Sequence, residues 1–204
     1  PLVLRNNVAN SGLLVSSDLR SFRRLGRMTP SNLDNRDVIL LPERVGGRFF
    51  MLHRPKEWIG PEYGCEYPSI WLSSSEDLLE WEDGTLLAKG ERSWEKKIGG
   101  SSPPLRTDAG WLTLYHGVDD HGTYRVGALL LDLTDPMRII ARTGEPIMEP
   151  EHEYETSGLY NGCVFPTGNV IIDGTLFVYY GAADKYCAVA TCNLNDLIQS
   201  LDSV

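Results

Sequence analysis

Trp71-Leu72-Ser73-Ser74-Ser75-Glu76-Asp77-Leu78-Leu79-Glu80-Trp81 runs from a short apolar strand through a polar turn to a leucine, and this order occurs four times in the 204-residue chain. The other copies are Leu14-Val15-Ser16-Ser17-Asp18-Leu19-Arg20-Ser21-Phe22, Leu129-Leu130-Leu131-Asp132-Leu133-Thr134-Asp135-Pro136 and Ala188-Val189-Ala190-Thr191-Cys192-Asn193-Leu194-Asn195-Asp196-Leu197. The leucines of the four turns, Leu19, Leu78, Leu133 and Leu194, are separated by 59, 55 and 61 residues. A regular period indicates a repeat architecture, in which each unit packs against its neighbours.

Upstream of the last three copies, a glycine turn leads into an alternating strand that is rich in aromatic residues. The turns are Gly46-Gly47, Gly110 and Asp173-Gly174, and the strands that follow cover residues 48–53, 111–116 and 175–180. Apolar runs precede the turns at residues 38–41, 102–105 and 170–172. Such turns between two strand-like runs predict β-hairpins. We therefore expect each unit to be a meander of about four strands, which is the size of a propeller blade.

The repeat predicts an all-β protein with a single β-propeller domain over residues 1–204. We place a partial blade at residues 1–26 and blades at residues 27–90, 91–145 and 146–204, which makes about three and a half blades. The only helix that we expect is a short one over residues 194–201. Because a propeller hides its strand edges by closing, we expect further N-terminal sequence or a homo-oligomer to complete the ring.

Composition excludes several classes of protein. The chain has 19 Lys and Arg against 28 Asp and Glu, a net charge of −9, and no apolar run near the roughly 18 residues of a membrane span. Its first residues lack the pattern of a signal peptide. These features predict a soluble, cytoplasmic protein that binds neither nucleic acid nor membranes. The cysteines, Cys65, Cys163, Cys187 and Cys192, lack metal-ligand spacing, so we predict buried thiols and no metal.

Cationic residues recur at the strand ends of successive units, although the chain is acidic overall. They are Arg36, Arg54, Lys97, His116 and Arg125, and Tyr124 lies beside the last of them. A group of such donors suits a compact polyanion such as phosphate. Each residue by itself is more often solvated or paired with a local carboxylate such as Asp37, Glu43 or Asp184, so the sequence leaves both interpretations open.

Seven motifs, in order along the chain, make a more specific interpretation possible. They are Asn35-Arg36-Asp37-Val38-Ile39-Leu40-Leu41-Pro42-Glu43, Leu52-His53-Arg54-Pro55, Lys97-Ile98-Gly99-Gly100-Ser101-Ser102-Pro103-Pro104, Tyr115-His116-Gly117-Val118, Tyr124-Arg125-Val126-Gly127-Ala128, Val164-Phe165-Pro166-Thr167-Gly168 and Tyr179-Tyr180-Gly181-Ala182-Ala183-Asp184. This series resembles the β-mannoside phosphorylases and related β-mannosidases, which are five-bladed β-propellers grouped as glycoside hydrolase family 130. The resemblance extends over essentially the whole chain.

The resemblance implies phosphorolysis, in which inorganic phosphate is the co-substrate and no cofactor takes part. Phosphate attacks the anomeric carbon of a β-mannoside and releases mannose 1-phosphate with inversion. The positions that match the family's phosphate-binding residues are Arg36, Arg54, Lys97, His116 and Tyr124. Asp184 matches a position that contacts the mannosyl unit.

The resemblance assigns no catalytic residue to this chain. The general acid of the family is an Asp on an early blade, upstream of the matching motifs, so we expect residues 1–204 by themselves to lack turnover. Two alternatives remain open from the sequence. One is a β-mannosidase, a hydrolase with the same fold, and the other is a non-catalytic carbohydrate-binding propeller.

Overall fold

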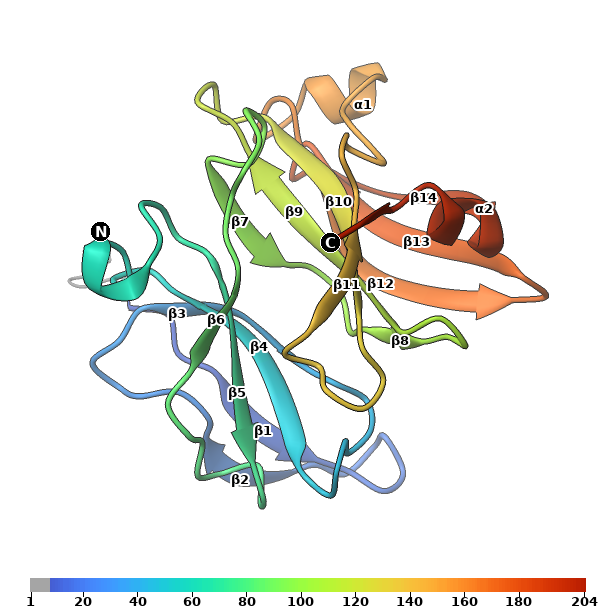
Figure 1. Ribbon diagram of the computed structural model, residues 1–204. Helices are drawn as coiled ribbons and strands as arrows, with labels where there is room; N and C mark the ends of the chain where they lie inside the picture. Colours follow the sequence, from blue (N-terminus) through green and yellow to red (C-terminus); the bar gives the residue numbers. More distant parts are fainter. Residues whose placement is uncertain (1–7) are drawn as a thin grey trace.

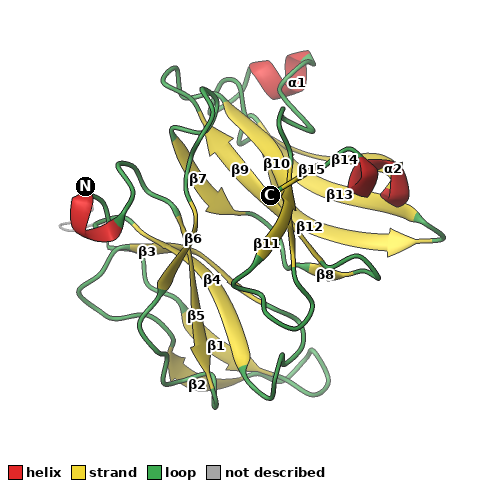
Figure 2. Ribbon diagram, in the orientation of Figure 1, coloured by secondary structure: helices red, strands yellow, loops and turns green. Residues whose placement is uncertain are grey.

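A computed structural model describes residues 8–204 and shows an all-β architecture of antiparallel sheets (Figure 1). Helix is confined to short peripheral pieces (Figure 2), namely η1 (Pro61–Tyr63), α1 (Glu153–Thr156) and α2 (Leu194–Gln199). Within residues 8–204, no helix is long and apolar enough to cross a membrane. The first seven residues of the predicted partial blade 1–26 lie outside the described part of the chain.

The strands form four sheets that follow one another along the chain. The first sheet pairs β1 (Gly12–Val15) with β2 (Arg23–Arg27). The second has the order β3 (Asn35–Leu40), β4 (Phe49–Pro55), β5 (Ile70–Ser75) and β6 (Thr85–Ala88). The third contains β7 (Lys97–Gly100), β9 (Trp111–Val118), β10 (Tyr124–Leu131) and β11 (Ile139–Arg142), and β8 (Leu105–Arg106) also pairs with β9. The fourth has the order β12 (Val164–Ile172), β13 (Thr175–Ala182) and β14 (Tyr186–Asn193).

The first two polar turns of the repeat share one pattern of hydrogen bonds. The Oγ of Ser75 accepts the backbone N–H of Leu78 at 2.9 Å, and the Oγ of Ser16 accepts that of Leu19 at 2.8 Å. Both leucines have a left-handed backbone, with φ of 71° and 56°. An Asp two residues after each Ser accepts the next two backbone N–H groups. The sequence repeat therefore reflects a repeated turn, which short polar side chains stabilise by bonding to the nearby backbone.

The last unit differs from the expected meander of four strands. Its turn continues into a helix, because the Oδ1 of Asn193 accepts the backbone N–H groups of Asn195 and Asp196 at the N-terminus of α2. The chain then adds a short strand, β15 (Asp202–Ser203), to β11 of the preceding sheet. The fourth sheet therefore has three strands, and the end of the chain ties it to its neighbour.

The third sheet is buried on both faces. All residues of β9 are buried, and they alternate between two hydrophobic clusters. Trp111 and Tyr115 pack toward the sheet β3–β6, whereas Leu112 and Leu114 pack toward the sheet β12–β14. Face-to-face packing of successive sheets, each on the next, is propeller-like and brings the inner strands of adjacent sheets together.

The outer face of the fourth sheet is exposed within residues 8–204. Ile172, Tyr179 and Val189 are each about half exposed there. The prediction that all four cysteines are buried is wrong for two of them, since Cys187 and Cys192 are exposed on β14. Cys187 shares the exposed outer face of β14 with Val189, whereas Cys192 lies on the other face of the strand and lines a groove beside residues 143–148.

Candidate functional site

Two arginines of the predicted site lie directly opposite each other on neighbouring strands. Arg36 on β3 and Arg54 on β4 are paired residues in the antiparallel register. Like charges in this position repel each other. A carboxylate offsets the charge of each arginine: Arg36 donates to both oxygens of Asp34, at 2.9 and 3.0 Å, and the Nε of Arg54 donates to Oδ2 of Asp37 at 2.5 Å. The two arginines can therefore stay close together in the absence of an anion.

A bulge in β3 brings Asp37 to the centre of the site. The pairing of β3 with β4 shifts between Arg36 and Ile39, and Asp37 has a left-handed φ of 53°. Gly99 on β7 makes room for the carboxylate, because a Cβ at Gly99 would come within 2.0 Å of Oδ2 of Asp37. Oδ2 of Asp37 also lies 3.6 Å from Nε2 of His116. The second and third sheets therefore meet at Asp37.

His116 does not add a charge to this group at neutral pH. Its side chain is almost completely buried, and this burial lowers the pKa of His116 to about 4. Its ring packs at 4.6 Å from the ring of Phe165 and at 5.6 Å from that of Tyr124, and the Oγ of Ser101 lies 3.3 Å from Nδ1. His116 is therefore a neutral donor or acceptor, whereas the sequence pattern placed it among the cations.

Lys97 and Tyr124 form the adjacent part of the site. The Nζ of Lys97 donates to the Oη of Tyr124 at 3.1 Å and lies 5.1 Å from the centre of its ring. Burial lowers the pKa of Lys97, and the positive charges of Arg54 and Arg36 lower it further. Burial also raises the pKa of Tyr124. A bound anion would offset the repulsion among the three cations, which makes the group a chemically reasonable anion site.

Arg125 does not belong to this group. It follows Tyr124 on β10, and successive side chains of a strand point to opposite faces. Its guanidinium pairs with Asp119 at 2.7 Å and with Glu149 at 3.0 Å. For Arg125, the interpretation as a cation paired with local carboxylates is the right one.

Asp184 lies on the same side of the molecule as Tyr124. It is exposed in the turn between β13 and β14 and has a left-handed φ of 54°. Its negative charge contributes to raising the pKa of Tyr124 and that of Cys163. The fourth sheet therefore supplies a carboxylate near the cationic group, and its contact with a sugar stays a prediction.

The structure brings together five residues from two sheets that the sequence singled out: Arg36, Arg54, Lys97, His116 and Tyr124. Sequence reasoning missed two further members. Asp37 was considered only as a local partner of a cation, and Phe165, which packs on His116, carries no polar signal. The bulge that turns Asp37 inward has no signal in the sequence, because a left-handed Asp looks like any other Asp.

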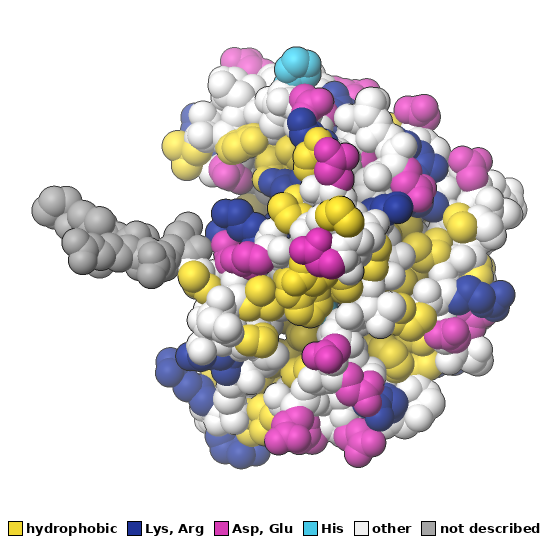
Figure 3. Space-filling model, turned by 60° about the vertical axis from the view of Figure 1, so that its left-hand side comes forward, with side chains coloured by type: hydrophobic (Ala, Val, Ile, Leu, Met, Phe, Trp, Pro, Cys, Tyr) yellow, Lys and Arg dark blue, Asp and Glu magenta, His cyan; other side chains and the backbone are white. Residues whose placement is uncertain are grey.

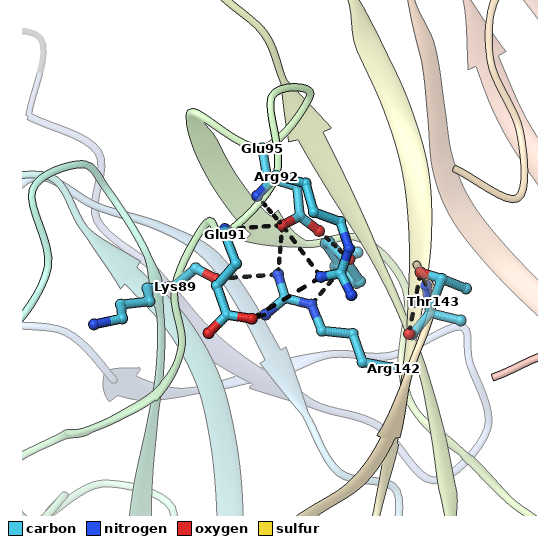
Figure 4. A network of polar contacts seen from close by, with 8 residues as sticks. Lys89, Glu91, Arg92, Glu95, Arg142 and Thr143 are labelled. Carbon is cyan, nitrogen blue, oxygen red and sulfur yellow. Dashed lines mark hydrogen bonds and ion pairs between the residues drawn. The ribbon is translucent and has the colours of Figure 1, made fainter. Parts of the chain in front are cut away.

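A buried carboxylate next to the site holds the surrounding chain in place (Figure 4). Glu95 is fully buried; its Oε1 accepts the Oη of Tyr115 at 2.5 Å, and its Oε2 lies 2.8 Å from an Nη of Arg142. It also accepts the backbone N–H groups of Glu91 and Arg92. Because Glu95 is two residues before Lys97 and Tyr115 precedes His116, this network fixes the backbone on both sides of the site.

The tyrosine and backbone contacts of this network recur one unit later. Oε2 of Glu155 accepts the backbone N–H groups three and four residues before it, and Oε1 accepts the Oη of Tyr180 at 2.6 Å. The sequence signal was present, since Glu91 and Glu95 have the same spacing as Glu151 and Glu155. The repeat therefore includes a buried Glu–Tyr pair as well as the polar turns.

A groove of the structure lies away from the cationic group. It has a volume of about 750 Å³ and is lined by residues 143–148, the edge of β14 and α2. Figure 3 shows acidic and basic side chains interspersed with exposed hydrophobic ones over one face of the molecule. Within residues 8–204, no group of His, Cys, Asp and Glu side chains could hold a metal ion.

Comparison with known proteins points to one family. The family model of glycoside hydrolase family 130, described as β-1,4-mannooligosaccharide phosphorylase, matches residues 10–203. A 1,2-β-oligomannan phosphorylase from Thermoanaerobacter sp. (strain X514) is 39% identical over 187 residues, which cover 91% of this chain and 59% of that protein. A β-1,4-mannooligosaccharide phosphorylase from Ruminococcus albus is 29% identical over 83% of this chain and 51% of that protein.

A solved structure shows the same fold over nearly the same range. The β-1,2-mannobiose phosphorylase from Listeria innocua, in complex with β-1,2-mannobiose, superposes with a TM-score of 0.85 at 33% sequence identity. The superposition covers 93% of this chain and 52% of that one. The chain thus spans between about half and three fifths of the length of these relatives.

We expect Glu95→Ala to lower the free energy of unfolding by about 3–5 kcal/mol, because it leaves Arg142 buried without its main partner. The matched control is Glu91→Ala, since Glu91 also pairs with Arg142 but is exposed, and its removal costs less than about 1 kcal/mol. Urea denaturation at pH 7 measures the free energy of unfolding of both variants and of the unsubstituted chain. Equal losses for the two variants would contradict the proposed importance of burial.

We also expect the protein to lose stability as the pH falls from 6.5 toward 4. Burial lowers the pKa of both His53 and His116 to about 4, from an ordinary value of 6.5. Below pH 6.5 the unfolded chain takes up protons that the folded chain excludes, so the free energy of unfolding decreases by roughly 2 kcal/mol per histidine at pH 5. Urea denaturation at pH 7 and pH 5 tests this, and His53→Gln should reduce the difference between the two values. A free energy that does not change with pH would rule the explanation out.

Proposed function

The chain belongs to glycoside hydrolase family 130, the family of the β-mannoside phosphorylases, and on this premise we propose that it forms the phosphate-binding part of a glycoside phosphorylase. The reaction is attack of inorganic phosphate on the anomeric carbon of a β-mannoside. The C–O bond to the leaving sugar breaks, and mannose 1-phosphate forms with inverted configuration. One observation carries this proposal: three cations, a neutral histidine and a tyrosine converge from two neighbouring sheets.

The geometry suits a nucleophile that must be held and oriented. Arg36 and Arg54 offer planar guanidinium groups, and Lys97 adds a charge from the adjacent sheet. Tyr124 and His116 supply hydrogen-bonding groups from β10 and β9. Fixing the anion in this way lowers the entropic cost of bringing phosphate and sugar together.

We propose that the mannosyl unit lies between this group and Asp184, whose exposed carboxylate accepts hydrogen bonds from sugar hydroxyls. We further propose that the general acid lies outside residues 1–204, so that this chain alone binds phosphate without turnover. The complete ring is then five-bladed, with the exposed face of the sheet β12–β14 covered by a further blade or by a second copy of the chain.

The substrate class follows from the relatives with the higher identity. The proteins described as acting on β-1,2-linked mannosides are 37–39% identical to this chain, whereas the β-1,4-mannooligosaccharide phosphorylase is 29% identical. We therefore propose a β-1,2-linked mannoside as the substrate of the complete enzyme.

Binding of inorganic phosphate tests the proposed site directly. We expect calorimetric titration of the chain at pH 7 to show phosphate binding, and we expect Arg54→Ala and Lys97→Ala each to weaken it by about tenfold or more, because each removes a charge-assisted hydrogen bond. The control is Arg125→Ala, which removes a cation of β10 that lies on the opposite face from Tyr124 and is paired with Asp119 and Glu149. The proposal fails if the chain binds no phosphate, or if Arg125→Ala weakens binding as much as Lys97→Ala.

The product separates phosphorolysis from the two alternatives. We expect the chain, supplemented with the part of the Listeria innocua relative that the superposition leaves uncovered, to convert β-1,2-mannobiose into mannose 1-phosphate only when phosphate is present. Release of free mannose without phosphate would instead indicate a β-mannosidase. Sugar binding without either product would favour a non-catalytic carbohydrate-binding propeller. Chromatography of the sugar phosphates distinguishes the three results.

A further inference from the structure

Asp37 is a carboxylate at a place where an anion site would be expected to have none. Its Oδ2 accepts the Nε of Arg54 and lies near Nε2 of His116. Its Oδ1 has no hydrogen-bond partner among the residues that the structure describes. Asp34 already balances the neighbouring Arg36. The free oxygen of Asp37 is therefore available to a ligand that carries a proton.

The carboxylate of Asp37 cannot readily turn away from the site. Its backbone has a left-handed φ of 53° within the bulge of β3, and Gly99 packs against Oδ2. Only 13% of the side chain is exposed. An anion that enters the site thus meets a negative charge that is held in place.

Arg54 brings the anion next to this carboxylate. Within residues 8–204, Arg54 donates only through Nε, which leaves its two Nη groups without a protein acceptor. A guanidinium group is planar and compact, so an anion on its Nη groups lies beside the carboxylate on Nε. The half-buried Nζ of Lys97 approaches the same region from β7.

We propose that Asp37 makes this site selective for a protonated tetrahedral oxyanion, so that it accepts phosphate and rejects sulfate. The inference rests on the proposed phosphate-binding function. Phosphate keeps at least one O–H group at neutral pH, and this group donates a hydrogen bond to Oδ1 of Asp37. Sulfate has the same shape but no proton, so its oxygen and the carboxylate repel each other. A fixed negative charge that repels sulfate and accepts a hydrogen bond from phosphate is an effective way to discriminate between the two anions.

A simpler role for Asp37 makes a different prediction. If the carboxylate only neutralised Arg54, its removal would strengthen the binding of every anion by a similar factor. If it accepts a proton from phosphate, its removal must change the ratio of the two affinities. The ratio is measured on one protein sample, so it does not depend on any general loss of affinity in a variant.

The experiment is calorimetric titration at pH 7 with phosphate, sulfate and monofluorophosphate, which has the charge of monohydrogen phosphate but no O–H group. We expect the unsubstituted chain to bind phosphate at least about tenfold more tightly than either of the other anions, since a hydrogen bond to a charged acceptor contributes about this much. In Asp37→Asn, the preference should fall to about threefold or less, mainly through tighter binding of sulfate. The monofluorophosphate titration needs no variant and tests the inference even if Asp37→Asn does not fold.

The matched control is Asp34→Asn, which removes one negative charge three residues before Asp37 and keeps an oxygen that can accept the backbone N–H of Ala9. We expect this variant to keep the preference for phosphate. Equal binding of phosphate and sulfate by the unsubstituted chain would overturn the selectivity and leave the phosphate site standing. A preference that survives in Asp37→Asn, or is lost equally in Asp34→Asn, would also overturn the role of Asp37. Binding of no anion at all would remove the proposed function together with this inference.

Discussion

The third sheet and the site depend on the contacts of one buried carboxylate, that of Glu95, with Arg142 and Tyr115. Burying a carboxylate costs several kcal/mol unless it is paired and hydrogen-bonded, and Glu95 meets this condition through Arg142, Tyr115 and two backbone N–H groups. Arg142 ends β11 and Tyr115 lies in β9, so one side chain ties the segment before β7 to two other strands. Glu95 thereby fixes the backbone next to Lys97 and, through Tyr115, the backbone next to His116.

The charge of the protein is distributed unevenly around this framework. The chain carries a net charge of −9, yet Arg36, Arg54 and Lys97 gather at the junction of two sheets. Asp34 and Asp37 make this arrangement tolerable without a ligand, because each pairs with one arginine. The local balance of charges, rather than the net charge, decides which ligands the site can accept.

The sequence predicted the repeat, the hairpins at Gly46-Gly47 and Asp173-Gly174, and the five residues that the structure brings together around Asp37. These features depend on local turn chemistry and on period, which a sequence displays directly. Other expectations were wrong. The last unit has three strands because Asn193 starts a helix, and Cys187 and Cys192 are exposed. Of the two interpretations left open for Arg125, pairing with local carboxylates is the right one, because Arg125 lies on the opposite face of β10 from Tyr124.

The sequence by itself determined the all-β class, the repeat of 55 to 61 residues and the strand ends at which polar residues recur. Only the tertiary structure decided the charge of His116, because burial between two sheets removes the water that would stabilise its protonated form. The tertiary structure alone also decided that Asp37 faces Arg54 and His116. These residues lie 17 and 79 positions from Asp37 in the sequence, and a bulge in β3 and the space at Gly99 bring them together. Contacts of this kind depend on how sheets pack, and no local pattern encodes them.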